Sequence, residues 1–253
     1  MTVLLLKLAG PLQSWGADSR FTERKTRHEP TKSGVIGLLA AALGRRREKA
    51  IDDLASLRFG VRIDQPGHFE SDFQTERMRE WDKERLRWIP KTSLPLSHRY
   101  YLADAVFVVA LEGDAQLLSK CARALEHPAF PLFLGRRACP PATKILLSFN
   151  EDGGVFQALR ETSWQASINY QKRREFRNQQ EVKLEILTDV LKEDTDNTKG
   201  YEVVRDIPLS FSQARREYAW RQVVHDFVMV SNPSYCPNLP FHNPWEALQE
   251  GTS

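Results

Sequence analysis

The sequence has few of the residues from which metal centres and disulfide frameworks are built. Its 253 residues include three cysteines, Cys121, Cys139 and Cys236, and none of them forms a CxxC pair. An odd number of widely spaced cysteines argues against a disulfide framework or a structural zinc site and favours a reducing, cytoplasmic setting. The six histidines include no pair at metal-ligand spacing. We therefore expect no metal and no cofactor.

Long apolar runs and catalytic motifs are also missing. The longest stretches without Asp, Glu, Lys or Arg are residues 33–44 and 227–245. The first is too short for the roughly 20 apolar residues that span a bilayer, and the second contains four prolines. No P-loop and no GxSxG elbow occurs. The sequence thus predicts neither a membrane protein, nor an ATPase, nor a serine hydrolase.

The chain is nearly neutral, but its charge is unevenly distributed. It has 36 Lys and Arg against 33 Asp and Glu, and residues 20–49 alone hold nine basic residues against three acidic ones. A local excess of cations matters more than net charge for binding a polyanion. Residues 20–49 are therefore the first place to expect a phosphate.

The first 150 residues contain two strand and helix units. We expect strands at 3–9, 57–63, 105–111 and 144–149, and helices at 33–43, 48–56 and 114–127. Residues 57–63 alternate strictly between apolar and polar, which is typical of a half-buried strand. Leaving the short helix aside, the order is strand, helix, strand, strand, helix, strand. This order predicts an α+β protein whose residues 1–150 form a ferredoxin-like (RRM-like) domain.

Two further segments complete the predicted organisation. Residues 72–100 are too long for a turn and contain two tryptophans, so we interpret them as an inserted arm that docks on a partner. Residues 151–253 are predicted to form a β-rich C-terminal domain. Within it, 182–186 and 201–209 should form a hairpin of a second sheet around a turn at 194–200, with another strand at 220–230.

The first candidate binding cluster lies near the N-terminus. Residues 8–16 read LAGPLQSWG, and Arg27, Lys32 and Ser33 precede or begin a helix. Free amides at a helix N-terminus can bind phosphate, with Ser33, Lys32 or Arg27 adding donors and charge. Trp15 could stack a base or belong to the core. The GxxG at 34–37 matches the backbone clamp of KH domains, but the pattern is weak and close helix packing is the favoured explanation.

The second candidate cluster is LGRRACP at residues 134–140. Gly135 permits an unusual backbone angle beside the guanidiniums of Arg136 and Arg137, which could bind a phosphate or a base edge. A solvated basic turn is the alternative interpretation. Metal-independent RNA cleavage would need a general base and an acid, which His28 with Lys25 or Lys32, or Tyr100, could supply.

Three strings in this order resemble the CasD-type subunits of type I-E CRISPR Cascade complexes. They are LAGPLQSWG at 8–16, PTKSGVIGLLAAALG at 30–44 and LGRRACP at 134–140. The motifs cover about the first 140 residues, and the remainder is similar only in length and β-rich character. The sequence lacks an RNP1-like string, so bases are not expected to stack across the sheet.

The resemblance implies an RNA-binding subunit of the RAMP class without catalytic activity. Such a subunit binds the 5′ repeat-derived handle of crRNA, caps the filament of CasC subunits, abuts the large CasA subunit and folds an arm over the RNA. Target DNA is then contacted only indirectly, through guide pairing in the complex. The residues that match the family motifs, and are expected to bind the handle, are Gln13, Trp15, Arg27, Lys32, Ser33, Gly135, Arg136 and Arg137.

The alternative function is a metal-independent endoribonuclease that processes CRISPR precursor RNA. Some related subunits of other CRISPR subtypes cleave precursor RNA, whereas type I-E systems give this task to a separate enzyme. A third possibility is a single-strand RNA binder unconnected to CRISPR. Selectivity for the handle and the presence or absence of cleavage distinguish the three.

Overall fold

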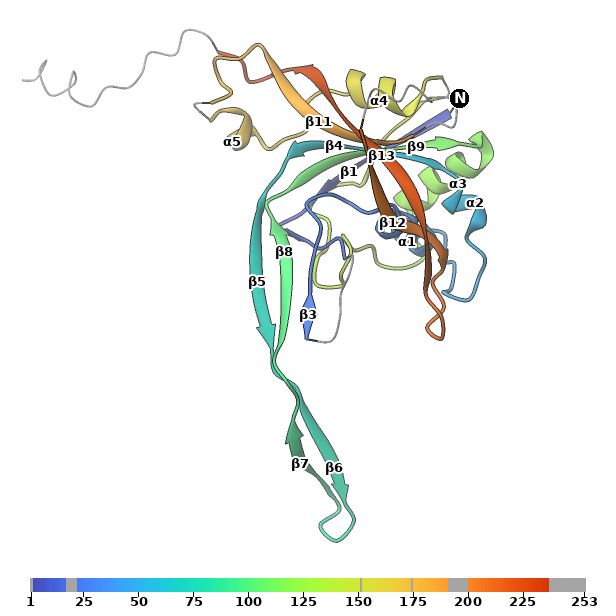
Figure 1. Ribbon diagram of the computed structural model, residues 1–253, viewed down its shortest axis with the longest axis vertical. Coiled ribbons are helices and arrows are strands. Elements are labelled where there is room, and N and C mark those ends of the chain that lie inside the picture. The colour runs from blue at the N-terminus through green and yellow to red at the C-terminus, as the bar shows by residue number, and fades with distance from the viewer. Residues whose placement is uncertain (1, 17–21, 151, 174, 191–199, 237–253) are drawn as a thin grey trace, which may run out of the picture.

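The computed structural model describes residues 2–16, 22–150, 152–173, 175–190 and 200–236. In these residues the chain is a mixed α+β protein in which strands predominate (Figure 1). No helix in these ranges has both the length and the apolar character that crossing a bilayer requires.

The main sheet has seven antiparallel strands in the order β10-β1-β9-β4-β11-β13-β12. Its strands are β1 (Thr2–Ala9), β4 (Arg58–Gln65), β9 (Val106–Gly113), β10 (Leu146–Asn150), β11 (Glu181–Asp189), β12 (Tyr201–Ser210) and β13 (Glu217–Ser231). The strands expected in the first 150 residues all form, within a few residues of their predicted ends. β1 and β9 are buried almost throughout, as their continuous apolar runs predict.

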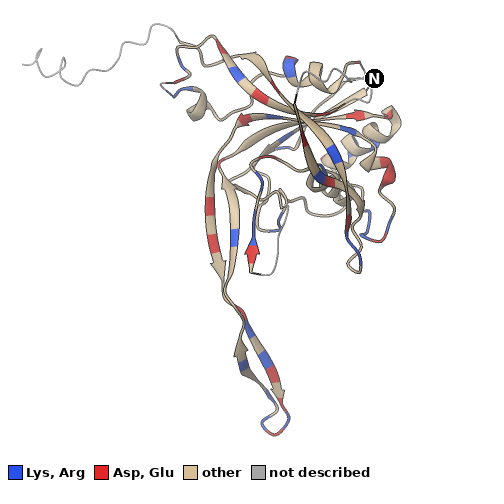
Figure 2. Cartoon of the chain, in the orientation of Figure 1, with Lys and Arg blue, Asp and Glu red and all other residues tan. Residues whose placement is uncertain are grey.

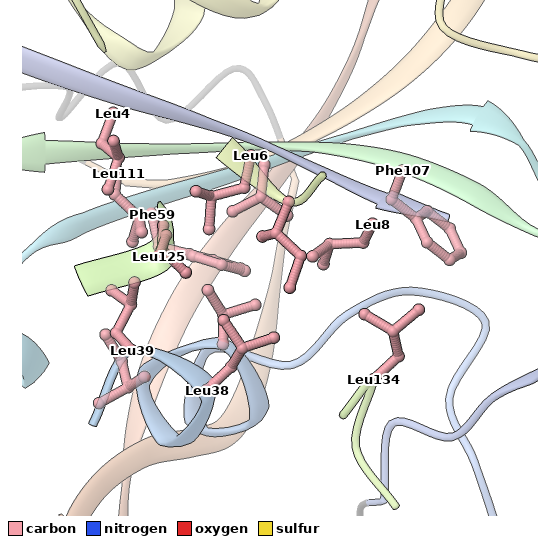
Figure 3. Close-up of a cluster of buried hydrophobic side chains, with 14 of the residues drawn as sticks. Leu4, Leu6, Leu8, Leu38, Leu39, Phe59, Phe107, Leu111, Leu125 and Leu134 are labelled. Carbon is pink, nitrogen blue, oxygen red and sulfur yellow. The ribbon is translucent and has the colours of Figure 1, made fainter. Parts of the chain in front are cut away.

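One face of the sheet is covered by three helices, α1 (Lys32–Ala42), α2 (Asp52–Ala55) and α3 (Ala115–Glu126). Leucines and phenylalanines of β1, β4 and β9 point toward α1 and α3 and form the larger core (Figure 3). Asp114 caps α3, because its carboxylate accepts a hydrogen bond from Leu117 N. Gly44, with φ of +71°, follows α1 as the expected stop.

The opposite face carries α4 (Val155–Glu161), α5 (Ile168–Gln171) and a second core cluster. The prediction that β4 is half-buried was therefore wrong, since both of its faces are covered. Arg62, expected on a polar face, is fully buried. Its guanidinium binds the Asp64 carboxylate and three carbonyl oxygens at the end of α4, those of Leu159, Thr162 and Ser163.

The C-terminal strands extend the main sheet, so the second sheet expected after residue 150 does not form. Ile186, Leu187 and Thr188 of β11 pair with β4. The predicted hairpin between β11 and β12 was also wrong, because the 15-residue β13 lies between them and pairs with both. The predicted turn lies mostly outside the described residues. The division into two domains at about residue 150 stays a prediction.

The insertion between β4 and β9 is a long β-hairpin that projects from the main sheet (Figure 1). Its base consists of β5 (His68–Gln74) paired with β8 (Ser97–Ala103), and its distal hairpin consists of β6 (Arg77–Asp82) paired with β7 (Arg87–Ser93). The short strands β2 (Leu12–Gln13) and β3 (Glu23–Arg24) also pair with β8. The arm thus begins beside the N-terminal motif at residues 8–16.

Candidate nucleic-acid interface

The motif at residues 8–16 and the loop at 134–140 pack against each other, although about 120 residues separate them in the sequence. Ser14 N donates a hydrogen bond of 3.0 Å to the Leu134 carbonyl. The Leu134 side chain is completely buried. At Gly10, a Cβ would lie 2.9 Å from the Pro140 carbonyl oxygen, so glycine permits the close approach. The two strings therefore form one structural unit.

Gly135 determines the path of the twin-arginine loop. Its φ is +88°, a conformation that side chains with a Cβ rarely adopt. A Cβ there would lie 1.8 Å from the Ser14 carbonyl oxygen, well inside van der Waals contact. Only glycine fits this approach, which fixes the direction in which the next two residues leave the body.

The two arginines that follow have different roles. The Arg136 guanidinium donates hydrogen bonds to the carbonyl oxygens of Tyr100, at 3.2 Å, and Arg24, at 2.6 Å, and it lies 4.9 Å from the centroid of the Tyr101 ring. Arg136 thus ties the loop to β8 and β3. Arg137 is exposed and has no hydrogen-bond or ion-pair partner within the described part of the chain.

Five basic residues lie on or beside the two strands and the loop that meet where the arm begins. Arg24 of β3 is in register with Arg99 of β8, and Arg136 bridges to both strands through backbone oxygens. Figure 2 shows basic residues on β8 and beside β3 at the arm base. Glu23 lies among them and pairs with Lys25 at 3.6 Å. We call the group formed by Arg24, Lys25, Arg99, Arg136 and Arg137 the arm-base surface.

The two faces of the distal hairpin of the arm carry different kinds of side chains. Because side chains alternate along a strand, Arg77, Arg79 and Trp81 of β6 share one face. Trp81 is paired with Trp88 of β7, with their rings edge to face and 5.5 Å apart. Glu80 is on the other face and pairs with Lys91 at 3.0 Å. The first face of β6 therefore combines arginines with an exposed tryptophan pair.

Gln13 and Trp15, both expected to bind RNA, are buried in the body. The Gln13 amide donates hydrogen bonds to the carbonyl oxygens of Leu8 and Ala105 and accepts one from Trp15 Nε1. The Trp15 ring is 1% exposed. A Cβ at Gly34 would lie 2.9 Å from this ring, so the GxxG pattern reflects helix packing at its first glycine. In this structure Trp15 has no free face on which a base could stack.

The N-terminus of α1 is occupied by a carboxylate of the protein itself. The Thr31 side chain caps the helix by accepting from Gly34 N, and Asp206 accepts a hydrogen bond of 2.7 Å from Lys32 N. The Lys32 ammonium is buried and pairs with Asp189 at 3.0 Å. Asp206 therefore takes the position in which we expected a phosphate. Ser33, which is half-buried, lies beside Thr31.

Arg221 completes the buried charge network beside α1. It pairs with both Asp206 and Asp189, and its guanidinium lies 5.1 Å from the centroid of the Phe59 ring. Burial by itself would lower the pKa of Arg221, but its hydrogen bonds and attraction to the two carboxylates outweigh burial and raise the pKa. The network joins the C-terminal strands to α1 and leaves Lys32 without a free ammonium group.

Arg27 also binds within the chain. It pairs with Glu29 and, at 2.9 Å, with Glu202 of β12. Burial opposes the charged form, yet the hydrogen bonds to Glu202 and Glu29 raise the pKa of Arg27 overall. His28 is exposed, and its ring contacts that of Phe69 at a centroid distance of 4.5 Å. Lys32, one possible partner of His28 in RNA cleavage, is held by Asp189.

The arm-base surface thus contains two of the eight expected residues, Arg136 and Arg137, and three that were not expected to bind RNA. A third expected residue, Gly135, sets the path of the loop that carries the two arginines. Arg24 was only part of the basic segment 20–49, Lys25 was considered only as a partner of His28 in cleavage, and Arg99 was only part of the arm. Nothing in the sequence shows that β3 pairs with β8. In the described residues, no group of three or more His, Cys, Asp or Glu side chains is placed to hold a metal ion.

Comparisons with known proteins find a family match and similar solved structures. Residues 3–224 match the family described as CRISPR-associated protein (Cas_Cas5). The chain is 33% identical over 148 residues to the CRISPR system Cascade subunit CasD of Escherichia coli strain K12, a match that covers 54% of this chain. The match spans 66% of that relative, slightly less than two thirds of its length.

Two solved structures are similar over nearly the whole chain. One, described as a CRISPR RNA-guided surveillance complex, has a TM-score of 0.74 and 32% identity, with 98% of each chain covered. The other, described as the crystal structure of a Cas protein, has a TM-score of 0.64 and 33% identity and covers 93% of this chain and 100% of that one.

Proposed function

The chain belongs to the CRISPR-associated protein (Cas_Cas5) family, and from this premise we propose that it is a subunit of a crRNA-guided Cascade surveillance complex in antiviral defence. Its task in the proposal is to bind the 5′ repeat-derived handle of crRNA. The similarity to CasD and to a chain of a surveillance complex supports the assignment.

The arm-base surface is the proposed contact with the handle. The observation that carries this proposal is the path of the loop set by Gly135, in which Arg136 is bound to β3 and β8, where Arg24 and Arg99 are in register, and the next residue, Arg137, is exposed. Guanidiniums bind phosphate through paired N–H donors, so this cluster suits an RNA backbone. Arg136 is proposed to position the loop as well as to add charge, because its donors already bind backbone oxygens.

The arm is proposed to fold over the RNA that leaves this surface. The face with Arg77, Arg79 and the tryptophan pair has both features that single strands require, namely cations for phosphates and aromatic rings for bases. We infer that β1, α1, β4, β9, α3 and β10 form a ferredoxin-like unit, because the neighbouring strands follow the order β10-β1-β9-β4 with α1 and α3 on one face.

The partners proposed for the chain are the CasC-type backbone filament, which it caps, and the large CasA-type subunit. Target DNA is contacted indirectly through pairing with the guide. The proposed role is non-catalytic. Endonucleolytic processing of precursor RNA is the competing outcome, and the experiment below measures it directly.

The test is to mix the purified chain, without metal, with labelled repeat RNA or a scrambled RNA at two salt concentrations. Binding and cleavage are followed in the same samples. We expect selective binding of intact handle RNA. Arg137→Ala should weaken this binding about tenfold, since one charge-assisted contact contributes about 1.5 kcal/mol or more. Arg123→Ala, an exposed arginine of α3, is the matched control and should bind normally.

Three outcomes would contradict the proposal in different ways. Equal affinity for the scrambled RNA would show that the chain does not recognise the handle. Normal binding by Arg137→Ala would show that the arm-base surface is not the contact. Specific cleavage by the wild-type chain that is lost in His28→Ala would replace the binding role with the nuclease role.

A further inference from the structure

The main sheet splits open between β4 and β11. These strands pair only through Ile186, Leu187 and Thr188 of β11, where they meet Arg62, Val61 and Gly60. Residues 181–185 of β11 pair with β13 on one side, and no strand in the described ranges pairs with their other side. Five residues in the middle of a seven-stranded sheet therefore present an open edge.

A pocket of about 400 Å³ lies where the two strands diverge. Trp164, Tyr170 and Phe176 form one of its walls, with each pair of rings in contact at centroid distances of 5.1 to 6.1 Å. Val182 and Leu184 of β11 line it as well, and Phe227 of β13 is half-exposed at its border. The open edge thus adjoins a largely apolar cavity that can hold a side chain.

The charges around this pocket do not favour a nucleic acid. Two carboxylates, Asp64 and Glu185, line it together with Lys183 and His28, and Asp64 is already paired with Arg62, so the pocket has no excess of cations that would bind phosphate. The Lys183 ammonium lies 4.1 Å from the centroid of the Phe227 ring. Mixed charge around an apolar centre resembles the polar rim of a protein interface, whereas the cationic excess is at the arm base.

We propose that the cleft between β4 and β11 is a docking groove for an extended segment of a neighbouring protein subunit. This inference rests on the proposed function, which supplies the multisubunit complex. The segment pairs as a strand with residues 181–185 of β11 and inserts an apolar side chain into the pocket. Backbone hydrogen bonds provide the attachment, and the aromatic wall selects the inserted residue.

Hydrogen exchange tests the pairing. Amide exchange is measured in the free chain and in the complex assembled with crRNA and its protein subunits. We expect the amides of residues 181–185 that face β4 to exchange about tenfold more slowly in the complex. Residues 186–188, already paired on both sides, should change little and provide an internal reference. Unchanged exchange at 181–185 in an assembled complex would overturn the inference.

A pair of variants tests the pocket. Phe227 borders the pocket, whereas Met229 does not; both are on β13, point to the same side and are 51% exposed. Phe227→Asp should weaken retention of one protein subunit about tenfold and leave handle RNA binding unchanged. Met229→Asp should have neither effect. Equal retention in the two variants would contradict pocket occupancy.

The two proposals fail in different ways. Protection of 181–185 by handle RNA alone would identify RNA as the occupant and overturn the protein groove. Normal handle binding without protection of residues 181–185 in the assembled complex would overturn the docking groove and leave the proposed function standing. A chain that joins no complex would overturn both.

Discussion

Gly135→Ala is expected to destabilise the protein and to displace the twin-arginine loop. A non-glycine residue at φ +88° costs about 1–2 kcal/mol. Moving the new Cβ away from the Ser14 carbonyl breaks the hydrogen bond between Ser14 N and Leu134 O, which contributes about 1 kcal/mol. It also partly exposes the buried Leu134 side chain, which costs a further 1–2 kcal/mol or so. The free energy of unfolding should fall by about 3–5 kcal/mol.

Urea unfolding measures this change, with Gly37→Ala as the matched control. Gly37 is inside α1, and a Cβ there would lie 3.6 Å from the Phe211 ring, an ordinary contact. Alanine should therefore leave stability unchanged or raise it by up to about 1 kcal/mol. Where Gly135→Ala remains folded, its handle affinity should fall at least as far as that of Arg137→Ala. A cost below about 1 kcal/mol would refute the assigned role of Gly135.

Further predictions concern the buried ion pair, pH and salt. Arg62→Ala leaves Asp64 buried without its guanidinium and should lower the unfolding free energy by about 3–5 kcal/mol; a normal urea midpoint would contradict this. The hydrogen bonds that the His225 ring donates to Glu185 and then to Glu202 raise the pKa of His225, so its stabilisation is complete below pH 6.5 and disappears as pH rises through the folded-state pKa. His225→Gln should remove this decline from pH-dependent melting curves, and an unchanged decline would exclude His225. Arg137→Ala should reduce the salt slope of handle affinity by about one, and identical slopes would argue against a phosphate contact.

The helices and strands of the first 150 residues could be predicted because each is marked by residues within its own segment. Asp114 followed by apolar positions at helical spacing indicates α3, and the run at 105–111 indicates β9. Pairing between distant strands has no such signal. Alternation shows which residues of β11 share a face, but it does not show that β13 and β4, instead of β12, are its neighbours.

Burial of charge could not be predicted where the element that covers it is distant in the sequence. Arg62 looked solvent-facing because α4, which covers it, begins more than 90 residues later. At the candidate site the sequence identified the loop at 134–140, since glycine beside two arginines is a local pattern. It did not identify Arg24 and Arg99, which the pairing of β3 with β8 brings to that loop.

The N-terminus of α1 shows how a correct local inference can lead to a different ligand. Its free amides and positive dipole do favour an anion, but Asp206, 174 residues away, is that anion. The variant Asp206→Asn distinguishes two possible roles of this carboxylate. It is either a permanent cap of the helix or a group that RNA phosphate displaces. As an internal cap, Asp206 holds both the helix and Arg221, so the variant should lose about 1–3 kcal/mol of stability and keep its handle affinity. If RNA displaced the carboxylate, removing its charge would strengthen binding. A rise in handle affinity in Asp206→Asn would therefore return Lys32 and Ser33 to the RNA interface.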